Sequence, residues 1–177
     1  MRTITTAHCM LEPLVAAHAP AMFRVLGDPA IYAFENEPPP SEEALVRRYR
    51  QLESRGPADG SETWLNWVIR LPGGELAGYV QATVLPSGAA TVADELNSRH
   101  WRQGIGSSAV RAMLEELHAR YAVDAFVAVL KAANFRSAAL LRSLGFVPGD
   151  AGQQLRHRDQ ADEQVMLRAA APPQNAV

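Results

Sequence analysis

The stretch WRQGIGSS (residues 101–108) is followed by apolar residues at helical spacing as far as Leu117, and it decides how this chain is interpreted. Glycines allow the backbone to turn sharply and to approach a ligand closely. The periodicity predicts a helix that begins near Ile105, and the free N–H groups at a helix start attract phosphate. The stretch therefore predicts a tight turn before a helix, which is either purely structural or an anion-binding loop.

The same glycines formally fit the fingerprint of dinucleotide-binding folds, with Ala109 as the last small residue and Asp124 as the acid. That fingerprint follows directly on a buried strand, whereas residues 97–103 are polar. Asp124 also precedes the next strand candidate instead of closing it. A dinucleotide site is therefore not favoured.

Upstream of this stretch, the pattern changes from helical to strand periodicity. Residues 3–11 are expected to form a strand, residues 16–26 a helix, and residues 31–40, with three consecutive prolines, a loop. Ser41 is a good N-cap for a second helix that stops before Gly56. Three strands joined by Gly/Pro turns follow at 64–71, 75–85 and 89–96. They predict an antiparallel meander.

Downstream, the apolar run 125–130 is typical of a strand buried on both faces. Asn134 caps a further helix that ends at Gly145, and short strands are expected at 146–147 and 165–167. The order β-α-α-β-β-β-α-β-α-β-β predicts a mixed α/β sheet with helices packed on its faces. We expect one domain over residues 1–168 and a disordered tail over 169–177.

Three segments taken together carry a family resemblance. They are the glycine stretch, the pair Asn134 and Ser137 at N-x-x-S spacing, and the sequence LGF at residues 144–146. In this order they resemble the GNAT superfamily of acyl-CoA-dependent N-acetyltransferases, and most closely the ribosomal-protein N-terminal acetyltransferase subgroup. The superfamily loop is Q/R-x-x-G-x-G/A, and Trp101 stands at its first position, where this subgroup often has tryptophan. The resemblance covers nearly the whole chain.

The resemblance implies a GNAT fold in which two central parallel strands splay apart and acetyl-CoA, the co-substrate, binds in the cleft. It places the pyrophosphate on backbone amides of the glycine loop and the pantetheine arm along the end of the preceding strand. The implied cofactor-binding residues are Leu96, Asn97, Arg102, Gln103, Gly104, Ile105, Gly106, Ser107 and Asn134.

The resemblance also implies acetyl transfer to a primary amine by direct attack. It assigns the acid to Ser137, although a serine near a helix start equally serves to satisfy backbone groups. Glu95 is the candidate base. Asp94 precedes it, and because side chains of a strand alternate, we expect only one of the two to face the cleft. Subgroup members often carry a glutamate at the position of Thr91, and a water-relayed proton path without a dedicated base is also compatible.

The acceptor is expected to be a protein N-terminus or a small-molecule amine. Glu35 and Glu37, in the proline-bound loop, are candidates to line its pocket. Trp64 and Trp67 lie three apart in one strand and so face opposite ways, which predicts one in the core and the other, Trp64, over the acceptor cleft. A non-catalytic acyl-CoA-binding regulatory or sensor domain of the same fold is the alternative.

Composition limits the remaining possibilities. The chain has 177 residues, is 47% hydrophobic, contains one Cys and has a net charge of −2. We expect a cytoplasmic protein without disulfides, nucleic-acid partner or membrane span. The five His are scattered, so no metal site is expected, and a homodimer is compatible with the resemblance. The charge is uneven, because residues 28–62 hold eight acids and four arginines, whereas residues 99–142 hold six arginines and Lys131 against three acids.

Overall fold

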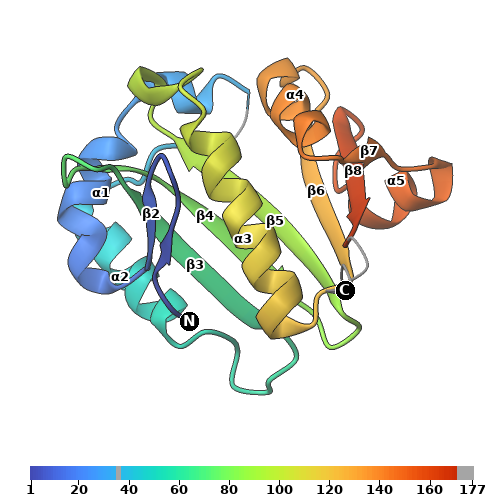
Figure 1. Cartoon of the computed structure of the whole chain (residues 1–177), viewed down its shortest axis with the longest axis horizontal. Helices are drawn as coiled ribbons and strands as arrows, with labels where there is room; N and C mark the ends of the chain where they lie inside the picture. The colour runs from blue at the N-terminus through green and yellow to red at the C-terminus, as the bar shows by residue number, and fades with distance from the viewer. Residues whose placement is uncertain (35–36, 171–177) are drawn as a thin grey trace, which may run out of the picture.

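A single mixed sheet organises the computed structural model, which describes residues 1–34 and 37–170 (Figure 1). The strand order is β1-β2-β3-β4-β5-β6-β8-β7, and among these described strands only β5 and β6 run parallel. The strands are β1 (Ile4–Thr5), β2 (Met10–Pro13), β3 (Thr63–Arg70), β4 (Leu76–Val84), β5 (Ala89–Leu96), β6 (Ala125–Lys131), β7 (Val147–Pro148) and β8 (Glu163–Ala169). This is the mixed α/β architecture that the sequence predicts.

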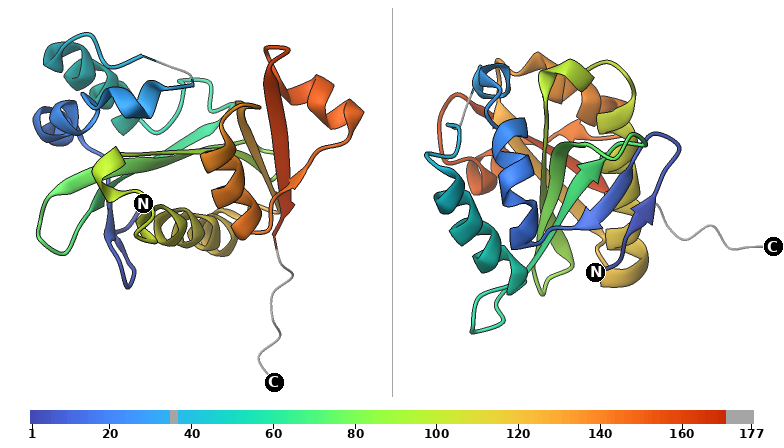
Figure 2. Two further views of the ribbon diagram at one scale, coloured as in Figure 1. Left: turned by 90° about the horizontal axis from the view of Figure 1, so that it is seen from above. Right: turned by 90° about the vertical axis from the view of Figure 1, so that its left-hand side faces the viewer.

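Helices cover both faces of this sheet. The α-helices are α1 (Ala19–Val25), α2 (Glu42–Glu53), α3 (Ile105–Tyr121), α4 (Phe135–Ser143) and α5 (Ala151–His157), and the 3₁₀ helices are η1 (Ala16–His18), η2 (Pro29–Tyr32) and η3 (Ser98–His100). Figure 2 shows α1, α2 and η2 on one face and α3 and α4 on the other. The side chain of Ser41 accepts a hydrogen bond from the Ala44 N–H at 3.1 Å, so the predicted N-cap of α2 is confirmed.

The two faces bury separate apolar cores. The larger core joins α3, through residues such as Met113, to Trp67 and Phe126 of the sheet. The smaller core lies under α1 and α2 and includes Met22 and Val68. The burial of Trp67 confirms that one tryptophan of β3 belongs to the core.

The N-terminal strand differs from its prediction. The single strand expected over residues 3–11 is replaced by two short antiparallel strands, β1 and β2, the second of which extends to Pro13. The hydroxyl of Thr6 accepts from the Cys9 N–H at 3.0 Å and donates to the Cys9 carbonyl at 2.8 Å. These local hydrogen bonds stabilise a turn and compete with a continuous strand.

Helix α5 was not predicted. Its sequence, AGQQLRH, has no apolar stripe, and its Leu155 is 74% exposed. Asp150 and Gln153 instead form a capping box, with both hydrogen bonds at 2.8 Å. Local capping therefore stabilises a short helix that hydrophobic periodicity cannot reveal.

At the C-terminal end, β8 extends to Ala169, which pairs with Ala125 of β6. The expected tail therefore begins at least one residue later than residue 169. The rest of that prediction falls on residues 171–177, which lie outside the described residues.

The parallel strands β5 and β6 separate part-way along their length. They are paired only from Ala89 opposite Ala125 to Thr91 opposite Val127. β5 continues to Leu96 and β6 to Lys131 without further pairing between them. The sheet therefore opens at the carboxyl ends of its two central strands, as the resemblance implies.

Residues 1–34 and 37–170 contain neither a membrane-spanning helix nor a metal-binding cluster. No helix there is long and apolar enough to cross a bilayer. No group of three or more His, Cys, Asp or Glu side chains is arranged there to hold a metal ion.

Candidate active site

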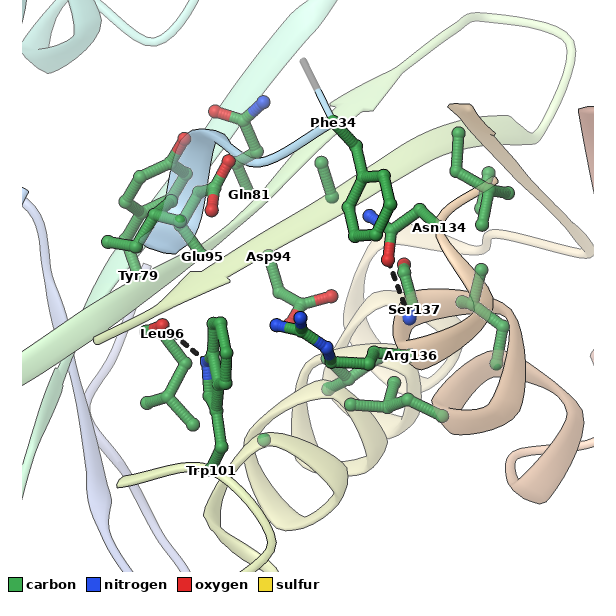
Figure 3. Close-up of a pocket in the computed structure, with 18 of the residues that line it drawn as sticks. Phe34, Tyr79, Gln81, Asp94, Glu95, Leu96, Trp101, Asn134, Arg136 and Ser137 are labelled. Atoms are coloured by element: carbon green, nitrogen blue, oxygen red, sulfur yellow. Dashed lines mark hydrogen bonds between the residues drawn. The ribbon is translucent and has the colours of Figure 1, made fainter. Parts of the chain in front are cut away.

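A cavity of about 1030 Å³ lies at the opening between β5 and β6 (Figure 3). Its walls come from η2 and the residues after it, from β4, β5 and β6, from the glycine loop, and from α3 and α4. Because its lining includes residues from both helical layers, the cavity reaches both faces of the sheet.

The glycine loop forms one end of the cavity. Gly104 is the N-cap of α3 and has φ 77°, a left-handed conformation that favours glycine. Arg102 has φ 61°, which is uncommon for a residue with a side chain. The indole N–H of Trp101 donates to the Leu96 carbonyl at 2.8 Å and ties the loop to the end of β5. Arg102, Gly104, Gly106 and Ser107 all line the cavity.

The start of α4 forms the opposite wall on the same face. The side-chain oxygen of Asn134 accepts from the Ser137 N–H at 3.1 Å, so Asn134 is the predicted N-cap. Both residues line the cavity. The helix ends before Gly145, whose φ of 85° fits the expected C′ position.

Arg136 was not singled out from the sequence, although it also lines the cavity. Its guanidinium carbon lies 4.3 Å from the ring centroid of Trp101, 5.6 Å from that of Phe135 and 5.8 Å from that of Phe34. These are cation–π distances. The aromatic rings therefore hold a positive charge at the wall of the cavity.

Asp94 and Glu95 both line the cavity, so the expectation that only one of them faces the cleft was wrong. Their side chains do point to opposite faces of β5, as alternation requires. The expectation failed because the cavity passes through the open sheet and meets both faces. Figure 3 shows Asp94 on the side of Arg136 and Ser137, and Glu95 beside Tyr79.

Asp94 is half-buried, and desolvation raises the pKa of its carboxyl from 3.8 to about 6. Its cross-strand neighbour is Val80, and the cavity wall on this face includes Val110 and Met113. Among the described residues, none forms a hydrogen bond or ion pair with this carboxyl. An ionised carboxylate without a partner in such surroundings destabilises the folded protein.

We expect Asp94→Asn to stabilise the protein at neutral pH and to have little effect near pH 4. Because the pKa of Asp94 is higher in the folded than in the unfolded chain, the folded state binds more protons between pH 3.8 and about 6. Stability therefore falls as the pH rises through this range, and the loss is complete above it. Allowing for water in the cavity, the loss is about 2 kcal/mol.

Thermal unfolding of both proteins at about pH 4 and about pH 8 measures this difference. The matched control is Asp124→Asn, since the Asp124 side chain is 84% exposed. An equal gain in melting temperature at both pH values would contradict the expectation.

On the other face of β5, Glu95 lies among tyrosines. Tyr79 is its cross-strand partner, and Tyr32 comes from η2. Burial, and then the charge of Glu95, raise the pKa of Tyr32 to about 12 and also raise that of Tyr79. Both hydroxyls therefore stay protonated at neutral pH. This part of the cavity combines aromatic surface with negative charge.

Three residues that the resemblance assigned to the cofactor are not among the cavity-lining residues. Asn97 is buried, and its amide donates to the Val25 carbonyl at 3.0 Å. Gln103 donates to the Arg99 carbonyl at 2.8 Å, and Ile105 packs into the larger core. The side chains of Asn97, Gln103 and Ile105 therefore stabilise the loop and its attachment.

The three acceptor-side candidates, Trp64, Glu35 and Glu37, are placed differently relative to the cavity. Trp64 does not line the cavity; it lies at the start of β3 and donates to the Glu62 carboxylate at 2.6 Å. Glu35 lies outside the described residues. Glu37, from the same loop, does line the cavity.

Several lining residues were missed because they carry no motif. They are Phe34, Tyr79, Gln81 and Arg136, together with Tyr32 of η2. Gln81 was the easiest of these to predict from the sequence, since a polar residue within the central strand of a meander needs a partner or a ligand. The tyrosines resemble ordinary strand and loop residues in sequence.

The family model of the acetyltransferase (GNAT) domain matches residues 8–147. The chain belongs to the GNAT acetyltransferase family. The match includes the whole glycine loop, β5, β6 and the start of α4, which form most of the cavity wall. No curated protein sequence matches this GNAT acetyltransferase significantly.

Solved structures share the fold along almost the whole chain. RimL, a ribosomal L7/L12 alpha-N-protein acetyltransferase solved with coenzyme A, is 19% identical, with a TM-score of 0.80 and coverage of 94% of this chain and 97% of that one. The microcin C7 self-immunity acetyltransferase MccE, solved with acetyl-CoA and AMP, is 14% identical, with a TM-score of 0.78 and coverage of 93% and 94%. The ribosomal-protein-S5-alanine acetyltransferase of Vibrio fischeri is 18% identical, with a TM-score of 0.77 and coverage of 97% and 97%.

Proposed function

We propose that this GNAT acetyltransferase transfers the acetyl group of acetyl-CoA to a primary amine by direct attack of the amine nitrogen. The observation that carries the proposal is the cavity at the open end of β5 and β6, which reaches from the glycine loop to Glu95 on the opposite face. Such a passage allows a carrier and an acceptor to meet from opposite sides, so that attack becomes effectively intramolecular.

The face with α3 and α4 suits the carrier. The first N–H groups of α3 have no acceptors within the helix, and Arg102 adds a positive charge beside them. We assign the pyrophosphate to the backbone from Gly104 to Ser107, and the pantetheine arm to the gap between Leu96 and Asn134. Structural neighbours solved with coenzyme A and with acetyl-CoA support this choice of carrier.

The opposite face suits a cationic acceptor. Glu37 and Glu95 are acids of the described cavity lining, and Tyr32 and Tyr79 supply aromatic surface beside Glu95. An amine in its ammonium form is attracted by this charge before it loses a proton. The acceptor is a protein N-terminus or a small-molecule amine, and the likeness to ribosomal-protein acetyltransferases supports the former.

The transfer needs proton movement at both ends of the reacting bond. The amine must be neutral to attack, and we assign its proton to Glu95, which lies on the acceptor face. The departing coenzyme A thiolate must gain a proton, for which the family resemblance suggests the Ser137 hydroxyl. Backbone N–H groups at the cleft are available to stabilise the oxyanion that forms on the acetyl oxygen.

A thiol-release assay tests the proposal directly. Acetyl-CoA is incubated with the protein and a panel of peptides with free N-termini, polyamines, amino acids and aminoglycosides. We expect thiol release that depends on the amine, with the acetylated amine detected by mass spectrometry. Tight acetyl-CoA binding without turnover on any amine would favour a regulatory acyl-CoA-binding domain instead.

We expect Glu95→Gln to lower kcat by about 100-fold, because the amide cannot accept the amine proton. The affinity for acetyl-CoA should stay within about threefold, since Glu95 lies on the face opposite the carrier. Steady-state kinetics and calorimetric titration with acetyl-CoA measure the two effects. Glu115→Gln on the exposed side of α3 is the matched control. Unchanged turnover in Glu95→Gln would favour a water-relayed proton path.

A further inference from the structure

Asp94 is an ionisable group in the cavity that the mechanism above does not use. It is half-buried on the α3 and α4 face of β5, and the structure gives its carboxyl no hydrogen bond or ion pair among the described residues. A desolvated carboxyl that lines a cavity and has no protein partner among the described residues is available to a group that a ligand brings.

The position of Asp94 relative to Glu95 defines which part of the ligand it meets. These two residues are consecutive in β5, so their carboxyls face opposite sides of the sheet at neighbouring positions along the strand. In the proposed function the amine reaches the acetyl carbon from the Glu95 side. The sulfur bonded to that carbon then lies on the Asp94 side, where the carrier arm runs.

We propose that Asp94 is a catalytic residue that protonates the departing coenzyme A sulfur. This inference rests on the proposed function and reassigns the proton donor from Ser137 to Asp94. As the amine nitrogen bonds to the acetyl carbon, the carbon–sulfur bond breaks and the sulfur takes the proton of the Asp94 carboxylic acid. The products are the amide and the free thiol, and the Asp94 carboxylate is reprotonated from water in the emptied cavity.

The surroundings of Asp94 favour the protonated carboxylic acid, which can donate a proton, over the ionised carboxylate. Desolvation raises the pKa of Asp94 to about 6, which keeps a fraction of it protonated near neutral pH. When the pantetheine arm replaces the cavity water, desolvation increases and the protonated fraction rises. A carboxylic acid is also a far stronger acid than a serine hydroxyl, and it is well matched to a thiolate.

Among the described lining residues, the other side chains that face Asp94 are apolar, basic or polar without charge. From α3, the lining residues Val110 and Met113 do not titrate, and neither do the lining residues 128–130 of β6. The glycine loop contributes Arg102, and α4 contributes Arg136. Among the described residues Arg136 forms no ion pair with Asp94; its guanidinium lies over aromatic rings, the nearest being that of Trp101 at 4.3 Å. Glu95 lies on the opposite face (Figure 3).

The test compares Asp94→Asn with Ser137→Ala across about pH 5 to 9, using saturating acetyl-CoA and an amine accepted by the wild type. We expect Asp94→Asn to lower kcat by about 100-fold while the acetyl-CoA affinity changes less than about threefold. In the wild type, kcat should fall on the alkaline side as Asp94 loses its proton. This limb should be absent in Asp94→Asn and retained in Ser137→Ala. Asp124→Asn, at an exposed site, controls for the substitution itself.

The outcomes separate the two proposals. A wild type without turnover on any amine overturns the proposed function and this assignment together. An active wild type with an unchanged kcat and pH profile in Asp94→Asn overturns only the role of Asp94. Equal losses of kcat and of acetyl-CoA affinity make Asp94 a binding residue, which also overturns it. If circular dichroism shows that Asp94→Asn does not fold, the pH dependence of the wild-type kcat decides. A wild-type kcat that does not fall on the alkaline side excludes Asp94 as the proton donor.

Discussion

Replacing Gly78 by alanine should destabilise the protein by about 3 kcal/mol or more. Gly78 lies in β4 opposite Leu96 of β5. A Cβ atom there would lie 2.0 Å from the Glu95 carbonyl oxygen and 2.9 Å from the Leu96 Cα. Both contacts are with backbone, so neither can be relieved by a rotamer change. The strands must separate, and their hydrogen bonds must lengthen or break.

This substitution should lower the melting temperature by roughly 10 °C. Turnover should also fall, because the strand segment that moves carries Glu95. Thermal unfolding followed by circular dichroism measures the first effect. Gly73→Ala is the control, since its Cβ would meet no atom within 4 Å, and it should shift stability by less than about 0.5 kcal/mol. A Gly78→Ala protein that melts with the wild type would contradict the close approach of β4 and β5.

The elements with strong periodicity were predicted well. In α3, the apolar residues recur at helical spacing because one side of the helix packs on the sheet, as the burial of Met113 and Leu117 reflects. The meander was predicted because β3, β4 and β5 are separated by Gly/Pro turns. In each case one face of the element must be buried, and this requirement repeats apolar residues at a regular spacing in the sequence.

The elements that depend on local hydrogen bonds were not predicted. The turn at Thr6 divides an apparent strand, and the capping box of Asp150 creates a helix without an apolar stripe. These features involve one or two residues each, and the same side chains also occur in turns and loops. Periodicity therefore carries no information about them.

The glycine loop and the start of α4 were located from sequence because Gly104, Gly106, Asn134 and Ser137 stand in a recognisable order. The motif gives the position of a residue and not the direction of its side chain. Gln103 and Ile105 belong to the motif, yet one bonds to the loop and the other enters the core. Likewise, alternation along β5 is correct, but the cavity that meets both of its faces arises from the separation of two strands distant in sequence.

The uneven charge of the chain is partly explained by the cavity. Arg102 and Arg136, from the basic segment, line it, and so does Glu37 from the acidic segment. Other charges of these segments form ion pairs elsewhere, as Arg120 does with Glu116 at 3.7 Å. The charge pattern therefore indicated the two ends of the cavity without identifying the residues.

Introducing an acid into the first turn of α3 should abolish acetyl-CoA binding. Gly106 is buried there, and a Cβ atom on it would lie 3.2 Å from Cδ1 of Leu140 and 3.8 Å from Cδ2 of Leu96. The carboxylate of Gly106→Asp would enter the space assigned to the carrier and repel its phosphates. We expect the affinity to fall by at least about 100-fold, which corresponds to about 2.7 kcal/mol.

The fold should survive Gly106→Asp, because the atom that the Cβ approaches most closely is the end of a flexible leucine side chain, and an acid in the first turn favours the helix dipole. Calorimetric titration with acetyl-CoA, together with circular dichroism, separates loss of binding from loss of structure. Gly106→Ala is the matched control: it adds the same Cβ without charge, so its affinity should stay within about fivefold of the wild type. If Gly106→Asp folds and binds acetyl-CoA as tightly as the wild type, the pyrophosphate lies elsewhere. If Gly106→Ala loses as much affinity as Gly106→Asp, the close contact with Leu140 is responsible and the repulsion of phosphate is not.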